Sequence, residues 1–209
     1  NRLHLARSYM LSGKAAEARA IFTAIIGSAS NPAQPDDASL AAAIALDKLD
    51  RTPGSPETAA PKLGDYEHLR RASIYQFNRD FPDARLHYAA IVADHPASGI
   101  MPDAIFQTGR GHAQEANFPE AVRWFERVIE QFPEHPLSRD ALLQVASAYA
   151  RVGKPHESVR RYQDFIAKYP GDERLDRAYL NIVDTLRDSG DEADARKWAR
   201  TAQEVFAGK

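Results

Sequence analysis

A period of 37 residues constrains the fold of this 209-residue chain more than any other feature of its sequence. Small residues recur at that spacing, at Ala84, Ala121, Ser158 and Ala195. Mostly small residues also lie twelve positions before each of them, at Ala72, Gly109, Ala146 and Val183. In three copies an aromatic residue and then a proline follow at fixed distances, at Tyr88 and Pro96, Phe125 and Pro133, and Tyr162 and Pro170. A fixed period of this size indicates stacked copies of one supersecondary unit.

Each copy is expected to form two helices joined by a tight turn. Helical spacing of apolar and small residues predicts first helices at 103–115, 140–151 and 177–188. Gly153 and Gly190 suit the left-handed backbone that ends a helix, and Asn117 tolerates it at the corresponding turn. Prolines that fit the first turn of the second helix are Pro82, Pro119 and Pro155. Because two helices approach closely only where both side chains are small, we expect Ala146 to contact Ser158.

The N-terminal part of the chain follows this pattern less regularly. Residues 3–26 repeat it, but Ala18 and Ala84 are 66 positions apart rather than twice 37. Between them lie a helix-like stretch, 36–50, and a Pro/Gly/Ser/Thr-rich stretch, 51–64, which we expect to be an exposed, mobile loop. We therefore predict one α-solenoid domain over 1–209, divided into 1–30, an irregular 31–64, 65–102, 103–139, 140–176 and a degenerate 177–209.

The repeat resembles the tetratricopeptide repeat (TPR). The resemblance rests on the run "ASAYARVG" at 146–153, the small residue five positions after its glycine, the aromatic residue four later and the closing proline. TPRs typically have 34 residues, and the copies in this chain carry three more in the loop after the proline. The resemblance implies an all-α fold in which antiparallel helix pairs stack into a right-handed superhelix.

The composition argues against several classes of partner. Hydrophobic residues make up 44% of the chain and charged residues 27%, as in ordinary globular proteins, and the net charge is −2. Arginines are numerous on the expected second helices, but acidic residues alternate with them, which indicates a solvated face rather than a nucleic-acid site. No stretch approaches the roughly 18 consecutive apolar residues that a membrane span needs.

No motif in the sequence indicates catalysis. The chain has no cysteine, and its seven histidines form neither an i, i+4 pair nor an HExxH motif. The run "TGRGHA" at 108–113 falls within an expected helix and follows no strand, so it does not indicate a nucleotide site. We therefore expect no catalytic, cofactor-binding or metal-binding residue and no enzymatic activity within this segment.

The residues expected to bind a ligand are those of the first helices that packing does not use. The TPR resemblance implies that these helices line a concave groove, which they face with the positions two before, one after and five after the small residue. The candidates are Arg70, Ser73, Phe77, Gln107, Arg110, Gln114, Gln144, Ser147, Arg151, Asn181, Asp184 and Asp188. Since they are polar apart from one aromatic side chain, the groove suits a protein or peptide segment, or a polar polymer such as a peptidoglycan glycan strand, better than an apolar helix.

The 37-residue variant, with linkers such as "FPEHPLSRDA", resembles the TPRs of three families of the bacterial cell envelope. They are the outer-membrane-assembly lipoprotein, the periplasmic coordinator of the Tol-Pal system, and the superhelical region of soluble lytic murein transglycosylases. Residues 69–92, "LRRASIYQFNRDFPDARLHYAAIV", are most similar to the third.

This resemblance implies a periplasmic or cell-envelope location. It implies a non-catalytic arm that positions a partner protein or a peptidoglycan strand beside a lysozyme-like catalytic domain downstream of Lys209. The alternative is a free-standing adaptor of the outer-membrane-assembly or Tol-Pal type. The segment contains no signal peptide, and it begins in helical periodicity, so we expect it to be part of a longer protein.

Overall fold

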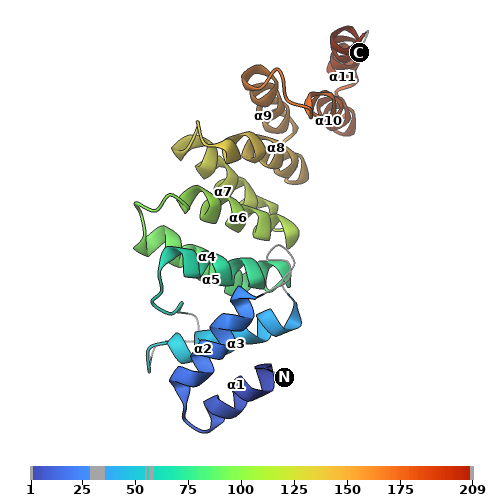
Figure 1. Cartoon of the computed structure of the whole chain (residues 1–209). Coiled ribbons are helices and arrows are strands. Elements are labelled where there is room, and N and C mark those ends of the chain that lie inside the picture. Colours follow the sequence, from blue (N-terminus) through green and yellow to red (C-terminus); the bar gives the residue numbers. More distant parts are fainter. Residues whose placement is uncertain (1, 29–35, 55, 57–58, 208–209) are drawn as a thin grey trace. The chain divides into compact units, whose positions relative to one another are not determined.

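The computed structural model describes residues 2–28, 36–54, 56 and 59–207, and within them all regular structure is helical. The helices, drawn in Figure 1, are α1 Arg2–Leu11, α2 Ala15–Gly27, α3 Asp37–Asp50, α4 Asp65–Phe77, α5 Phe81–Asp94, α6 Met101–Gln114, α7 Phe118–Gln131, α8 Pro136–Arg151, α9 Pro155–Lys168, α10 Leu175–Asp188 and α11 Glu192–Phe206. The predicted all-α fold of helix pairs is confirmed. The main difference is that α8 begins four residues earlier than expected, because Pro136 occupies its first turn and the His135 ring accepts the Leu137 amide at 3.3 Å.

The chain divides into two compact units, unit 1 (Asn1–Ala104) and unit 2 (Ile105–Lys209), and we describe each by itself. Helix α6 begins in unit 1 and continues into unit 2. In unit 1 the contacts join α1, α2, α3, α4 and α5 in chain order, and in unit 2 they join α7, α8, α9, α10 and α11 in chain order (Figure 1). The organisation of all 209 residues as one solenoid domain stays a prediction.

The turns within the helix pairs share one hydrogen-bond pattern. The residue with a left-handed backbone is followed by one whose amide donates to the carbonyl five residues earlier, at 2.8–2.9 Å. These amide–carbonyl pairs are Lys14–Tyr9, Asp80–Tyr75, Asn117–His112, Lys154–Tyr149 and Asp191–Leu186. The left-handed residues are Gly13, Arg79, Ala116, Gly153 and Gly190, with φ between 59° and 86°.

The turn before α7 corrects one prediction. Gly153 and Gly190 have the left-handed backbone that the sequence indicated, but Asn117 does not: its φ is −84°. The left-handed residue of that turn is Ala116, which lies 37 positions before Gly153. The hydrogen-bond pattern requires the left-handed residue one position earlier than Asn117, so the period outweighs the local preference of asparagine.

The recurring small residues are buried, and the direct contact between Ala146 and Ser158 stays a prediction. Ala146 of α8 and Ser158 of α9 are both 0% exposed, and Ala72, Ala84, Ala121 and Ala195 are at most 2% exposed. Gly109 shows why side chains must stay small there, because a Cβ atom added to it would lie 2.9 Å from the Phe125 ring.

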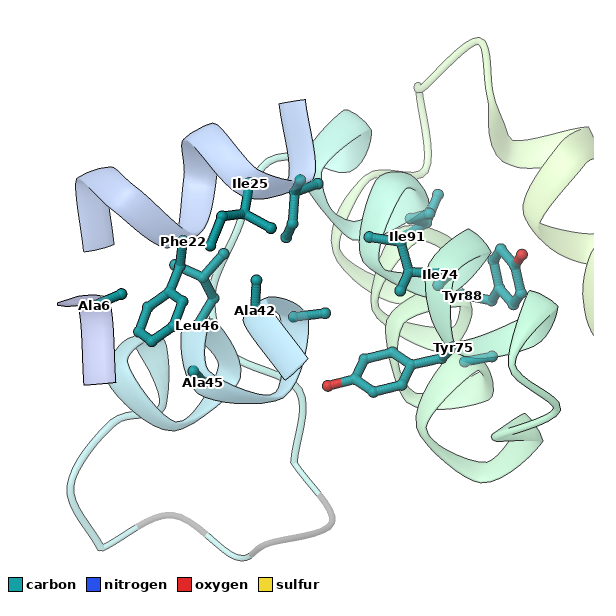
Figure 2. Packing of buried hydrophobic residues seen from close by; sticks show 14 of the residues in the cluster. Ala6, Phe22, Ile25, Ala42, Ala45, Leu46, Ile74, Tyr75, Tyr88 and Ile91 are labelled. Atoms are coloured by element: carbon teal, nitrogen blue, oxygen red, sulfur yellow. The ribbon is translucent and has the colours of Figure 1, made fainter. Parts of the chain in front are cut away.

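The irregular N-terminal region is built around α3, which matches the predicted helix at 36–50. Asp36 caps it by accepting hydrogen bonds from the backbone amide and the hydroxyl of Ser39, both at 2.8 Å. Phe22 of α2 packs between Ala6 of α1 and Leu46 of α3, as Figure 2 shows.

The predicted loop at 51–64 is non-helical where it is described. It is not wholly exposed, because Pro61 is buried and the Leu63 carbonyl lies 3.0 Å from His95 Nε2. Residues 55, 57 and 58, like 29–35 at the predicted boundary between the first two repeats, lie outside the described residues. The mobility expected of this loop stays a prediction.

A buried network of polar side chains connects α3, α4 and α5, and the sequence analysis did not predict it. Asp47 of α3 accepts hydrogen bonds from Arg71 Nη1 and from the Tyr75 hydroxyl, both at 2.6 Å. His87 Nε2 lies 3.0 Å from the same carboxylate, and His87 Nδ1 lies 2.9 Å from His68 Nδ1. In Figure 2 the Tyr75 hydroxyl is directed from α4 toward α3. These five residues, the buried network, are each at most 7% exposed, so their role is to hold three helices together.

Candidate ligand-binding groove

Two adjoining cavities lie among the first helices of unit 2. The first has a volume of about 600 Å³ and the second about 400 Å³. Ser147, Tyr162 and Asn181 line both of them, so the two cavities form one continuous depression, which we call the inner groove. Its walls come from α6, α8 and α10, the first helices of three successive repeats, and from α9.

Helical periodicity explains why these side chains line one surface. Residues three, four, seven and eleven positions apart lie on one face of a helix. On α8 this face carries Asp140, Leu143, Gln144, Ser147 and Arg151, and on α10 it carries Arg177, Asn181, Asp184 and Asp188. The opposite faces of both helices are packed into the core of unit 2, through Ala146 on α8 and Ile182 on α10 for example.

Tyr162 of α9 lines the groove between these two helices. Its ring is 3% exposed, and its hydroxyl oxygen accepts a hydrogen bond from Asn181 Nδ2 at 3.1 Å. Burial raises the pKa of the Tyr162 phenol, so the hydroxyl stays neutral at physiological pH. The bond restrains the Asn181 amide group at the wall that both cavities share.

The charged groups of the groove differ in how far they are already paired. The Arg174 guanidinium lies 2.6 Å from Asp140 and 2.9 Å from Asp172, and these hydrogen bonds raise its pKa still further. Arg110 instead donates to the neutral amide of Gln107 at 3.2 Å. Arg177 is exposed, and its guanidinium makes no ion pair with any described residue. Arg110 and Arg177 therefore keep their charges available to a ligand.

Most of the candidate residues predicted in unit 2 lie together. Those that line the inner groove are Arg110, Gln144, Ser147, Arg151, Asn181, Asp184 and Asp188. Two do not: Gln107 is half-buried and bonded to Arg110, and Gln114 is exposed at the end of α6. That any of them binds a ligand stays a prediction.

The three candidates in unit 1 share the exposed face of α4. Arg70 and Ser73 are exposed, and Phe77 is 50% exposed. The Ser73 hydroxyl is already used, since it donates to the Leu69 carbonyl of the preceding turn at 2.8 Å.

The sequence analysis missed several groove residues, and the reasons differ. Arg177 lies one helical turn before Asn181, so extending the predicted stripe by one turn would have found it. Tyr162 belongs to a second helix, and its aromatic ring was attributed to packing, which hid the role of its hydroxyl. Arg174 lies in the stretch between two predicted first helices, which the prediction treated as a linker, whereas Asp140 and Leu143 lie on the predicted helix at 140–151, outside the three offsets used to choose candidates.

Two buried titratable groups of unit 1 have shifted pKa values. Burial, together with the neighbouring His87, His95 and Arg71, lowers the pKa of His68 to about 4. Burial opposes ionisation of Asp47, but hydrogen bonds from His87, Tyr75 and Arg71 outweigh it and lower the pKa of the carboxyl. Within the described ranges, no group of three or more His, Asp or Glu side chains is placed to hold a metal ion. None of the helices described is both long and apolar enough to cross a bilayer.

Comparisons with known proteins agree with this fold. The model of one protein family, described as "YfiO: Outer membrane lipoprotein", matches residues 99–207. No curated protein matches the chain.

Solved structures similar to the chain are TPR-like. MamA from AMB-1 has a TM-score of 0.54 at 13% identity, over 100% of this chain and 91% of that one. A Podosopora anserina protein described as a kinesin light chain with nearly identical TPR-like repeats has a TM-score of 0.54 at 16% identity, over 99% and 93%. A tetratricopeptide repeat protein from Parabacteroides merdae ATCC 43184 has a TM-score of 0.52 at 18% identity, over 98% and 78%. At these identities the likeness shows a TPR-like fold alone.

Proposed function

Because the chain belongs to the YfiO family of outer membrane lipoproteins, whose model matches more than half of it, we propose that it is a TPR scaffold of the bacterial cell envelope that binds a partner protein in the inner groove of unit 2. In this proposal the segment performs no chemistry of its own. It holds a polypeptide of another protein and so brings that protein to an assembly at the envelope.

The observation that carries the proposal is a continuous polar groove whose side chains are not needed for packing. Gln144, Ser147, Arg151, Asp184 and Asp188 are exposed, although they lie on helices whose opposite faces are fully buried. The cavities are within the size range of binding sites, about 300–1,000 Å³. Amide and hydroxyl groups flanked by charged side chains suit hydrogen bonding to an extended peptide backbone.

Site-specific photocrosslinking tests the proposal. A benzoylphenylalanine placed at Gln144 faces the inner groove, and one at Arg123 of α7, whose side chain is 76% exposed, serves as the matched control. In living cells we expect a protein adduct from position 144, lost when Arg110→Glu and Arg177→Glu are combined, and none from position 123. Equal adducts from both positions, or an adduct from 144 that survives the double substitution, would count against binding in the groove.

The arm of a lytic murein transglycosylase is the second candidate function. It rests on the resemblance of residues 69–92, which form most of α4 and most of α5 in unit 1, whereas the family match covers 99–207. The two candidates differ in what the groove would hold, a polypeptide or a glycan strand. The same crosslinking experiment distinguishes them, because an adduct that a muramidase digests would contain peptidoglycan.

A further inference from the structure

Building on the proposed function, we infer that the inner groove selects an extended polypeptide segment carrying an acidic and a basic side chain three to five residues apart, with the acidic group in the first cavity and the basic group in the second. The inference rests on the sign, the availability and the spacing of the charges along the groove.

The two cavities have opposite net charge. Three guanidinium groups and one carboxylate line the first, from Arg110, Arg174, Arg177 and Asp140, which leaves two positive charges. One guanidinium and two carboxylates line the second, from Arg151, Asp184 and Asp188, which leaves one negative charge. A uniformly charged ligand would therefore be attracted at one end and repelled at the other.

The charges that produce this difference are available to a ligand. Asp140 is paired with Arg174, so the excess positive charge of the first cavity belongs to Arg110 and Arg177. In the second cavity Arg151 lies 5.9 Å from the Phe118 ring, and Asp184 lies 3.5 Å from exposed Arg187 in a pair that water screens. Asp188 is exposed and has no ion pair among the described side chains, so it presents a free carboxylate.

The spacing of these charges sets the spacing in the ligand. Arg177, Asp184 and Asp188 lie on one face of α10, and an α-helix rises about 1.5 Å per residue, so the carboxylates stand about 10 Å and 16 Å from Arg177 along the helix axis. An extended polypeptide advances about 3.3 Å per residue. The opposite charges of the ligand are thus three to five residues apart.

The middle of the groove suits an extended backbone rather than a helix. Gln144 and Ser147 of α8 face Asn181 of α10 with donors and acceptors that peptide groups can pair with. Among the described residues, no exposed Leu or Met side chain, which an amphipathic helix would need, lines either cavity. Phe106 is 6% exposed and Leu143 is half-buried.

A small peptide panel tests this selectivity. Four labelled peptides of the form X-Ala-Ser-Ala-Z carry Glu then Lys, Lys then Glu, two Glu, or two Lys at the ends, and soluble peptidoglycan glycan fragments form a fifth arm. We expect the full chain to bind one of the two mixed-charge peptides at least about tenfold more tightly than the doubly acidic and doubly basic ones, because two complementary contacts replace one attraction and one repulsion. Circular dichroism verifies that each variant below is folded.

Charge reversals at the two ends then give opposite results. Arg110→Glu with Arg177→Glu should move the preference to the doubly basic peptide, and Asp184→Lys with Asp188→Lys to the doubly acidic one. Arg123→Glu on the outer helix α7 should leave the preference unchanged. Equal binding of all four peptides, reversals without effect, or preference for the glycan would overturn the inference. If the groove crosslinks to a protein while the peptides are not distinguished, only the charge rule fails; if no protein is captured, the proposed function fails.

Discussion

Acidification should destabilise unit 1 through His68. Its ring is 1% exposed, and its Nδ1 lies 2.9 Å from Nδ1 of His87, whose Nε2 faces the Asp47 carboxylate at 3.0 Å. With the His87 Nε2–H donating to Asp47, the free Nδ1 of His87 accepts the Nδ1–H of neutral His68. A second proton on His68 would create a charge inside a closed network, near Arg71 and His95.

The size of the effect follows from the two pKa values of His68. The group titrates near 6.5 in the unfolded chain and near 4 in the folded one. Because the folded pKa is the lower one, the contribution is fully present above pH 6.5 and is lost as the pH falls toward 4. A pH of 5 is 1.5 units below the pKa of His68 in the unfolded chain, and each unit corresponds to about 1.4 kcal/mol. The free energy of unfolding should therefore be about 2 kcal/mol lower at pH 5 than at pH 7.5.

Hydrogen exchange of the α4 amides, followed by mass spectrometry between pH 7.5 and 5 and corrected for intrinsic rates, measures this loss within unit 1. His68→Asn keeps an N–H donor for His87 but cannot be protonated. Between pH 7.5 and 5 this variant should therefore lose about 2 kcal/mol less stability than the wild type. The comparison cancels the contributions of the other titrating groups, and exposed His156→Asn is the matched control. Equal pH dependence in the wild type and His68→Asn would refute the assignment of the effect to His68.

Three substitutions and one matched control, all measured by thermal or urea unfolding, test the helix contacts and turns. Ser158→Ala should stabilise unit 2 by about 1 kcal/mol, because the buried Ser158 hydroxyl has no hydrogen-bond partner among the described atoms; a loss of stability would mean that a water satisfies it. Ala116→Gly should stabilise the protein by about 0.5–1 kcal/mol, because glycine adopts the left-handed backbone of this turn without strain. The control Ala89→Gly, within helix α5, should destabilise the protein by about the same amount. If both substitutions changed stability in the same direction, the role assigned to the turn would be contradicted. Ala146→Leu should destabilise by about 1–3 kcal/mol through overpacking, and an unchanged midpoint would show that the α8–α9 contact is looser than described.

The sequence predicts the repeating part of this fold because each repeat is specified locally. Ala146 and Ser158 are buried where the period placed them, and Pro119 and Pro155 start the second helices as expected. The left-handed residue Ala116 was missed by one position, because an asparagine preference was weighed above the period.

The buried network could not be predicted in the same way. The side chains of Arg71 and His87 that meet Asp47 lie 24 and 40 residues from it in the chain. Charged and histidine side chains in an amphipathic helix ordinarily indicate the solvent face. Only the tertiary arrangement of α3, α4 and α5 shows that these are enclosed.

The candidate site was predictable as far as it depends on one helix at a time. A fixed offset from the small residue reached Arg110, Ser147 and Asn181, which line the same cavity. The offset gave no information about Tyr162, since its hydroxyl reaches the groove from a second helix. Nor could it show that Arg174 is neutralised by Asp140 while Arg177 is not, because that difference depends on contacts between repeats.

The hydrogen bond between Asn181 and Tyr162 has a mechanical consequence. It joins α10 to α9 at the midpoint of the groove, where both cavities also meet Ser147 of α8. A ligand that fills the groove touches α8, α9 and α10 at once and therefore braces two adjacent repeats against hinging. Binding in the groove would then restrict movement of α10 relative to α8 and α9.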